Sequence, residues 1–296
     1  MKPIHPPLKI WKLKPQPKVE SPNLNVNPFN HDPSFERLLA IRGYDNLEKI
    51  NNFLNPSFSD LPDPLIMKGM KEAVSVILSH FKSENKIMVL GDYDVDGTSS
   101  VALLCVFLKK IGADYIYYIP DRYKEGYGVS QASIAHANEK NVKLIISLDC
   151  GISAFHPIQN ARNMGIEFIV CDHHQPSKEL PIANAILDPK QEGCPYPFKE
   201  LSGCGVTFRL VQALGKVLKI PCSELMPLLD LVTISIASDI VPILGENRIL
   251  ASEGLKIINT TPRQGLKLLL ESSGKKRPFS ISDLVFGVGP KINAAG

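Results

Sequence analysis

Residues 86–100, KIMVLGDYDVDGTSS, place three aspartates directly after an apolar run. Residues 86–90 predict a buried strand, and Asp92, Asp94 and Asp96 follow within five positions. Carboxylates this close repel one another, and no neighbouring lysine or arginine offsets their charge. The stretch therefore indicates a site where a cation is needed.

From residue 86 onward, apolar runs alternate with segments long enough to be helices. Strands are expected at residues 86–90, 114–120, 143–149, 167–172 and 184–188. The first of the intervening helices is expected to have Thr98 or Ser99 as its N-cap and to stop at Gly112. Continuously apolar strands separated by helices predict an α/β fold, with a parallel sheet covered by helices on both faces and followed by a helical segment.

Acidic residues follow three of these expected strands. They are the Asp92–Asp96 motif, Asp149, and the Asp172-His173-His174 triplet. Ligands bind outside the carboxyl ends of parallel strands, so these side chains should converge. Aspartates with one or two histidines favour Mn²⁺ or Mg²⁺ over zinc, and two such ions could activate water and stabilise the leaving oxygen of a phosphoester. A lone DxDG is mostly a turn or helix cap, but its occurrence together with the other two motifs favours a metal site.

Composition limits the remaining possibilities. The 296 residues carry a net charge of only +3, so any polyanion must be held by local patches or metal ions. Six scattered cysteines without a CxxC argue against a disulfide framework or a zinc site and favour the reducing cytoplasm. No apolar run reaches 18 residues, so no membrane partner is expected. We expect an N-terminal arm and helical extension at 1–82, an α/β catalytic domain at 83–245, and a helical segment at 246–296.

Three further positions favour an anionic ligand or a metal. In SGCGVTFRL, Gly203 and Gly205 would let backbone N–H groups approach an anion at a helix start, although a plain helix start is as good an interpretation. Arg122 in IPDRYKEGYG suits bidentate phosphate contact, with a solvated surface arginine as the alternative. Asp239 ends an apolar helix, at the unfavourable pole of its dipole, which a metal would explain.

Together, the segments GDYDVDG, IPDRYKEGYG, SLDCG, CDHH, SGCGVTF, IASDIVPI and GPKINAAG resemble the DHH phosphoesterase superfamily. More narrowly, the chain resembles its RecJ-type single-strand-specific exonucleases, and the resemblance covers nearly the whole chain. It implies two Mn²⁺ or Mg²⁺ ions, with Asp149 bridging them. The metal ligands that it implies are Asp94, Asp96, Asp149, His173 and Asp239.

The resemblance also implies roles around the metals. His174 would lie beside the scissile phosphate, and Asp172 would orient the histidines, while Asp92 would give structural support. Residues along the path of the DNA strand would be Arg122, Ser202, Gly203 and Asn293. The chain departs from the pattern at Leu90, where many members have histidine. It also ends inside GPKINAAG, where members continue into further domains, so a fragment is expected.

The activity that the resemblance implies is metal-dependent removal of nucleotides from the 5′ end of single-stranded DNA, in repair and recombination. It implies a cytoplasmic monomer whose partners are single-strand-binding protein and a helicase. Two alternatives stay open: a phosphodiesterase or phosphatase acting on short oligonucleotides or cyclic dinucleotides, and an inactive replication scaffold with degraded metal ligands. A dinucleotide-binding oxidoreductase is disfavoured because no GxGxxG follows the first strand.

Overall fold

The computed structural model describes residues 33–295 of the chain, which forms two compact units, Met1–Pro56 and Ser57–Gly296. In the first unit the described elements are α1 (Pro33–Ile41) and α2 (Leu47–Leu54). Helix α2 begins after Asn46, whose side chain accepts the backbone N–H of Lys49. The expected N-terminal arm lies outside the described residues.

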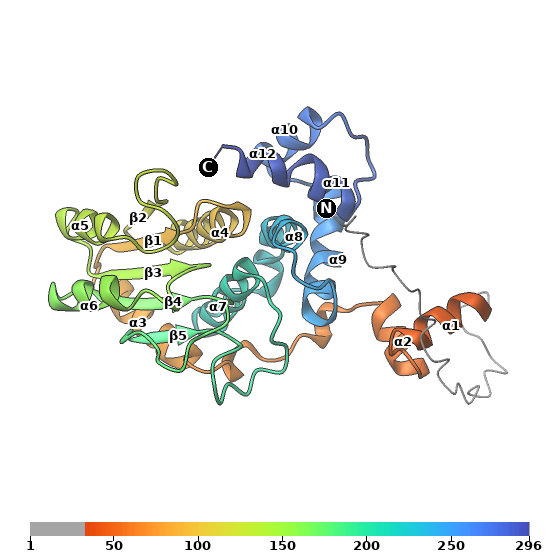
Figure 1. Ribbon diagram of the computed structural model, residues 1–296, viewed down its shortest axis with the longest axis horizontal. Helices are drawn as coiled ribbons and strands as arrows, with labels where there is room; N and C mark the ends of the chain where they lie inside the picture. The colour runs from red at the N-terminus through yellow and green to blue at the C-terminus, as the bar shows by residue number, and fades with distance from the viewer. Residues whose placement is uncertain (1–32, 296) are drawn as a thin grey trace, which may run out of the picture. The chain divides into compact units, whose positions relative to one another are not determined.

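The second unit contains a five-stranded sheet, drawn in Figure 1. Its strands are β1 (Ile87–Gly91), β2 (Tyr115–Tyr118), β3 (Leu144–Leu148), β4 (Glu167–Cys171) and β5 (Ala185–Leu187). All pairs are parallel and the order is β2-β1-β3-β4-β5. The parallel sheet expected from the apolar runs is therefore confirmed.

Helices cover both faces of this sheet, as expected. Alternate residues of β1 point to opposite faces, since Ile87 and Val89 belong to one buried cluster and Met88 and Leu90 to another. The first cluster includes α3 (Met70–Lys82), α4 (Val95–Ile111) and α7 (Gly203–Leu218). The second includes α5 (Gln131–Glu139) and α6 (Phe155–Asn163).

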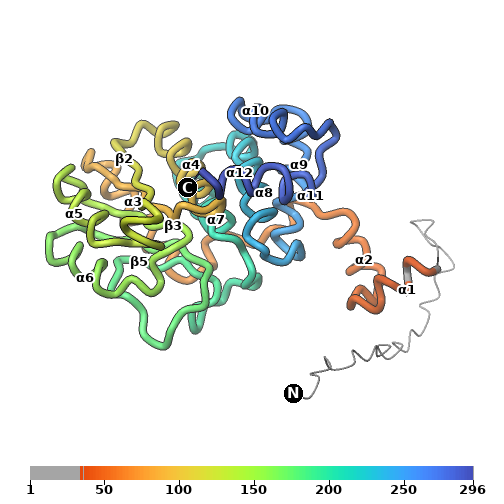
Figure 2. The backbone as a smooth tube through the Cα atoms, turned by 45° about the horizontal axis from the view of Figure 1, so that its top comes forward, coloured from red at the N-terminus to blue at the C-terminus, as the bar shows by residue number. Residues whose placement is uncertain are grey.

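The expected helical segment contains α9 (Gly245–Thr260), α10 (Gln264–Ser272), α11 (Ile281–Gly287) and α12 (Gly289–Asn293). The other elements of this unit are α8 (Leu229–Ser238), which precedes that segment, and the short 3-10 helices η1 (Phe58–Asp60), η2 (Pro64–Ile66), η3 (Cys222–Glu224) and η4 (Met226–Leu228). Val95, in the first turn of α4, belongs to the same buried cluster as Leu284 and Val288. Figure 2 shows α12 beside α4, and Asn293 Oδ1 accepts the backbone N–H of Val95 at 3.0 Å. The helical segment thus contacts the turn that carries the first aspartate motif.

The start of α4 differs from expectation. Thr98 or Ser99 was expected as its N-cap, but Asp94 is the N-cap and accepts the backbone N–H of Gly97 at 2.9 Å. A carboxylate is favoured there because it pairs with free N–H groups at the positive end of the helix dipole. The expected end is confirmed, since Gly112 closes the helix with a φ of 76°.

Two expectations from composition can be compared with the structure. None of the helices in the described part of the chain is long and apolar enough to cross a membrane. All six cysteines, which lie within that part, are free.

Candidate metal centre

The strand ends explain why carboxylates gather at one edge of the sheet. Gly91 pairs with Leu148, Leu148 with Cys171, and Cys171 with Leu187, so four neighbouring strands end in register. An aspartate follows each of these four ends, at positions 92, 149, 172 and 188. The chain order reverses between β1 and β3, and such a switch leaves a crevice outside the carboxyl ends.

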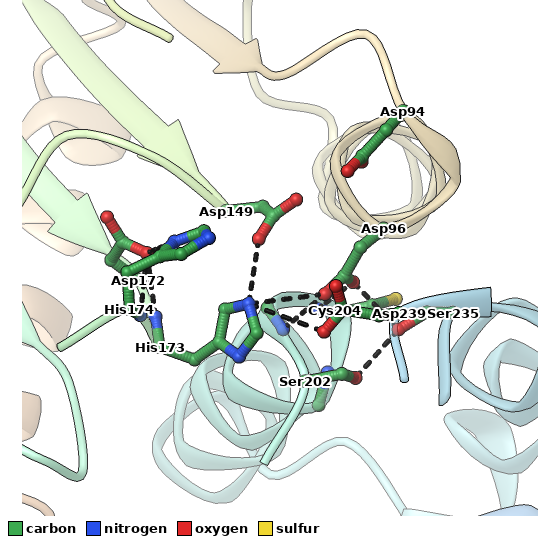
Figure 3. A network of polar contacts seen from close by, with 12 residues as sticks. Asp94, Asp96, Asp149, Asp172, His173, His174, Ser202, Cys204, Ser235 and Asp239 are labelled. Carbon is green, nitrogen blue, oxygen red and sulfur yellow. Dashed lines mark hydrogen bonds and ion pairs between the residues drawn. The ribbon is translucent and has the colours of Figure 1, made fainter. Parts of the chain in front are cut away.

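The centre of the site is the ring of His173, which follows β4. Its Nε2 atom lies 3.1 Å from Asp149 Oδ1, 3.4 Å from Asp239 Oδ2 and 3.7 Å from Asp96 Oδ2. Figure 3 shows these side chains converging from separate parts of the chain, with Asp94 on the first turn of α4 above them. Five expected metal ligands are therefore grouped in one region.

Several polar atoms in this cluster are buried without a hydrogen-bond partner among the described residues. They are both ring nitrogens of His173, Asp149 Oδ1 and Asp239 Oδ2. Native proteins leave few buried polar groups unpaired, and each one calls for a ligand, a water or an ion. Two sets of three side chains have ligand atoms close enough to share one cation: Asp96 with His173 and Asp239, and Asp149 with His173 and His174.

Electrostatics also favour a cation. Burial, with the nearby charge of Asp96, raises the pKa of Asp149 well above its ordinary value. The same two causes raise the pKa of Asp239 to about 8, and burial lowers the pKa of His173. A divalent cation would stabilise the ionised form of these carboxylates, and it would bind the neutral form of the imidazole. The residues present therefore fit a divalent metal with oxygen and nitrogen ligands.

The start of α7 binds Asp96. The backbone N–H groups of Gly203 and Cys204 and the hydroxyl of Ser235 each donate to the Asp96 carboxylate at 2.7 Å. Gly203 also leaves room for Asp149, because a Cβ at position 203 would lie 2.7 Å from Asp149 Oδ1 and 3.0 Å from its Cα. The glycine expected to let a backbone N–H approach an anion thus does so, and the anion is a side chain of the protein.

Ser202 and Gly205 complete this helix start. Ser202 is fully buried, and its hydroxyl accepts the Gly205 N–H at 3.1 Å and lies 2.7 Å from Ser235 Oγ. Gly203 is buried too. Their expected contact with a DNA strand stays a prediction, while their visible contacts serve to fix Asp96.

Asp172 holds the second histidine of the triplet. Its Oδ1 atom lies 2.7 Å from His174 Nδ1 and also accepts the backbone N–H of His173 at 2.8 Å, and its Oδ2 accepts that of Ile152. Burial acts to raise the pKa of Asp172, but the hydrogen bond from His174 and the backbone donors outweigh it and lower that pKa. The same bond raises the pKa of His174, whose side chain remains 46% exposed. Asp172 therefore fixes the ring of His174, whereas it contacts His173 through the backbone.

The other expected residues surround the cluster. The guanidinium of Arg122 lies 4.3 Å from the ring centroid of Tyr93, and its Nε is buried without a partner among the described residues. Asn293 caps the first turn of α4 through Val95. Leu90, at the position where the resemblance implies a histidine in many members, is fully buried in β1 within an apolar cluster.

Sequence reasoning missed Asp188 and Tyr127. Asp188 follows β5 in the same row as the other strand-end aspartates, and burial raises its pKa to about 7. The apolar run of residues 184–188 already ended in this aspartate. Tyr127 places its hydroxyl between Asp149 and His174. It lies within the segment IPDRYKEGYG, in which only Arg122 was expected to have a role.

Comparisons with known proteins agree with this geometry. A family model described as "DHH family, N-terminal domain" matches residues 86–236. The single-stranded-DNA-specific exonuclease RecJ of Bacillus subtilis is 42% identical over 288 residues, which is 97% of this chain and 36% of that protein. The Escherichia coli protein of the same name is 35% identical over 281 residues, 91% of this chain and 48% of that protein. The chain thus spans about a third to a half of the length of these relatives.

Two solved structures of RecJ proteins are also similar to this chain. The structure of RecJ from Thermus thermophilus in complex with Mn²⁺ matches with a TM-score of 0.74 and 30% identity, covering 88% of this chain and 36% of that one. A structure of exonuclease RecJ bound to manganese matches with a TM-score of 0.71 and 34% identity, covering 80% of this chain and 58% of that one.

Proposed function

Because this chain belongs to the DHH family, we propose that it hydrolyses phosphodiester bonds of single-stranded DNA from the 5′ end, in repair and recombination. The observation that carries the proposal is the buried His173 ring, whose Nε2 lies within 3.7 Å of three carboxylates and has no hydrogen-bond partner among the described residues. The similarity to proteins named single-stranded-DNA-specific exonuclease supports the choice of substrate.

The proposed metal ligands are the five residues grouped at the strand ends, Asp94, Asp96, Asp149, His173 and Asp239. Similar solved structures contain Mn²⁺ or Mg²⁺, so we propose two ions of either kind here, with Asp149 between them. When bound, such ions supply an activated water and stabilise the charge on the leaving oxygen. The protein supplies the carboxylates in fixed positions, because Asp96 is held by the start of α7 and Asp94 caps α4.

Residues beside the metals would bind the substrate. His174 is half exposed, and Asp172 holds its ring at Nδ1. Its Nε2 lies 3.3 Å from the Tyr127 hydroxyl, so a phosphate oxygen would share this ring nitrogen with that hydroxyl. Arg122 presents a planar guanidinium suited to two phosphate oxygens, and Tyr93 stacks against it. These two groups would position the scissile phosphate, and Asn293, Ser202 and Gly203 would line the strand's path.

The proposal also covers the cellular location, the oligomeric state, the partners and the domain boundaries. We propose a cytoplasmic monomer that works with single-strand-binding protein and a helicase. The domain division expected from the sequence, with boundaries after residues 82 and 245, belongs to the same proposal.

The experiment is a hydrolysis assay with Mn²⁺ on 5′-labelled and 3′-labelled single-stranded oligonucleotides, the matching duplex, and a dinucleotide. We expect 5′-labelled mononucleotide at the earliest times, no reaction on a blunt duplex, and loss of activity with EDTA or in His173→Ala. Asp60→Asn is a matched control, because Asp60 is exposed and distant in sequence from the cluster. Hydrolysis of the dinucleotide alone would favour the short-oligonucleotide alternative, and metal binding without any hydrolysis would favour a scaffold.

A further inference from the structure

The loop between β2 and α5 carries a tyrosine into the candidate metal centre. Tyr127 lies between Gly126 and Gly128, both of which have a φ of 81°. Its hydroxyl lies 3.0 Å from the backbone oxygen of Asp149 and 3.3 Å from His174 Nε2. One side chain thus contacts both a proposed metal ligand and the proposed phosphate-binding histidine.

Tyr127 completes the support of the His174 ring. Asp172 holds this ring at Nδ1, and the Tyr127 hydroxyl meets it at Nε2. The two rings also pack edge to face, with centroids 6.0 Å apart and planes at 85°. The His174 side chain is 46% exposed, so these two polar contacts add to the ring packing against Tyr127 and His173 in fixing its ring plane.

Tyr127 also supports an unusual backbone at Asp149. This residue has a φ of 60°, which is rare and costly for a residue other than glycine. Its N–H donates to Cys171 O at 2.9 Å, and its carbonyl oxygen accepts the Tyr127 hydroxyl. Hydrogen bonds on both sides therefore hold the backbone in the conformation that points the Asp149 side chain toward His173.

The first aspartate of the opening motif holds the loop in place. Asp92 is buried, and its Oδ1 accepts the backbone N–H of Gly128 at 3.2 Å. Gly128 is also the residue next to Tyr127. The part of the chain that Asp92 supports is thus the loop that carries Tyr127.

We propose that Tyr127 is a positioning residue, which aligns the His174 ring and the Asp149 backbone for phosphodiester hydrolysis, and that Asp92 secures it through Gly128. The catalytic consequence rests on the proposed function, whereas the contact between Tyr127 and His174 can be tested without it. Tyr127→Phe is the informative variant, because it removes the hydroxyl and keeps the ring packed against His174.

With Mn²⁺ and a single-stranded oligonucleotide, Tyr127→Phe should lower kcat by at least about fivefold, the effect expected for one lost hydrogen bond, because the variant loses both contacts of the hydroxyl. KM should stay within about twofold. Tyr123→Phe is the matched control, because Tyr123 belongs to the same loop but is 91% exposed, and it should leave kcat unchanged. Asp92→Ala should resemble Tyr127→Phe, and Asp92→Asn, which keeps an oxygen acceptor for Gly128, should recover most of the loss. A raised KM with unchanged kcat would overturn the proposal, since it would mean that Tyr127 contacts the substrate directly.

The second readout is NMR of the histidine ring nitrogens in the metal-free chain, with the His174 signals assigned from His174→Gln. Tyr127→Phe should shift or broaden the Nε2 signal of His174, and Tyr123→Phe should leave it unchanged. Unchanged His174 signals in Tyr127→Phe would overturn the proposal. If no variant hydrolyses DNA, the proposed function fails, and the NMR comparison alone still decides whether Tyr127 holds His174.

Discussion

Replacing Asp239 by asparagine should make the metal-free protein more stable at high pH. Burial, with the charges of Asp96 and Asp94, raises the pKa of Asp239 from 3.8 to about 8. A folded-state pKa above the unfolded value means that the stabilising contribution is complete below about pH 4 and is lost as the pH rises through 8. Four pKa units would correspond to about 6 kcal/mol, as an upper limit. The Asp239 side chain is 19% exposed to solvent, which screens these charges, so we expect roughly 2 kcal/mol.

The assay is urea unfolding in EDTA at pH 4 and pH 8.5. Wild type and Asp239→Asn should have similar free energies of unfolding at pH 4, where the loss has only begun, and the variant should be more stable at pH 8.5. Saturating Mn²⁺ should reverse the order, because a ligand at 100 times its dissociation constant adds about 2.7 kcal/mol to a protein that keeps the site. Asp60→Asn should change neither value by more than about 0.5 kcal/mol. An Asp239→Asn variant less stable than wild type in EDTA at pH 8.5 would refute the reasoning, because the carboxylate would then have a stabilising partner without metal.

Three further outcomes follow from the same geometry. Gly203→Ala should lower the free energy of unfolding by at least about 2 kcal/mol, because its Cβ would meet Asp149 backbone and side-chain atoms. Gly205→Ala should cost less in the same urea titration, because its Cβ would meet only side-chain atoms of Leu201 and Ser202, at 3.3 Å or more. Asp149→Ala should reduce hydrolysis more than Asp92→Ala, since a carboxylate between two metals serves both; equal losses would remove the bridging assignment. His173→Ala should abolish the rise in melting temperature on adding Mn²⁺, and an unchanged rise would exclude this imidazole as a ligand.

The sheet could be predicted from sequence because its strands are apolar on both faces. Strands β1 and β3 are fully buried, so each is an unbroken apolar run that ends where the polar edge begins. The same rule located Asp149 and the triplet at strand ends, and the register of the strands explains why they meet. The apolar runs that predict the strands therefore also predict the site, because the site residues directly follow them.

What the sequence did not reveal depends on contacts between distant residues. The start of α4 was expected too late because its first turn is held by Asn293, 198 positions away, and by the cap at Asp94. The role of Gly203 depends on Asp96, 107 positions away. Tyr127 meets partners 22 and 47 positions away, so no local spacing could indicate it. Such contacts become visible only once the fold has brought the segments together.

Anomalous X-ray diffraction from crystals of this chain soaked in Mn²⁺ tests the central claim most directly. Two neighbouring peaks should lie among the five proposed ligands, with at least one within coordinating distance of His173 Nε2 and Asp149 lying between them. Mn²⁺ bound only elsewhere on the protein, with no peak beside His173, would contradict a metal centre at this edge of the sheet.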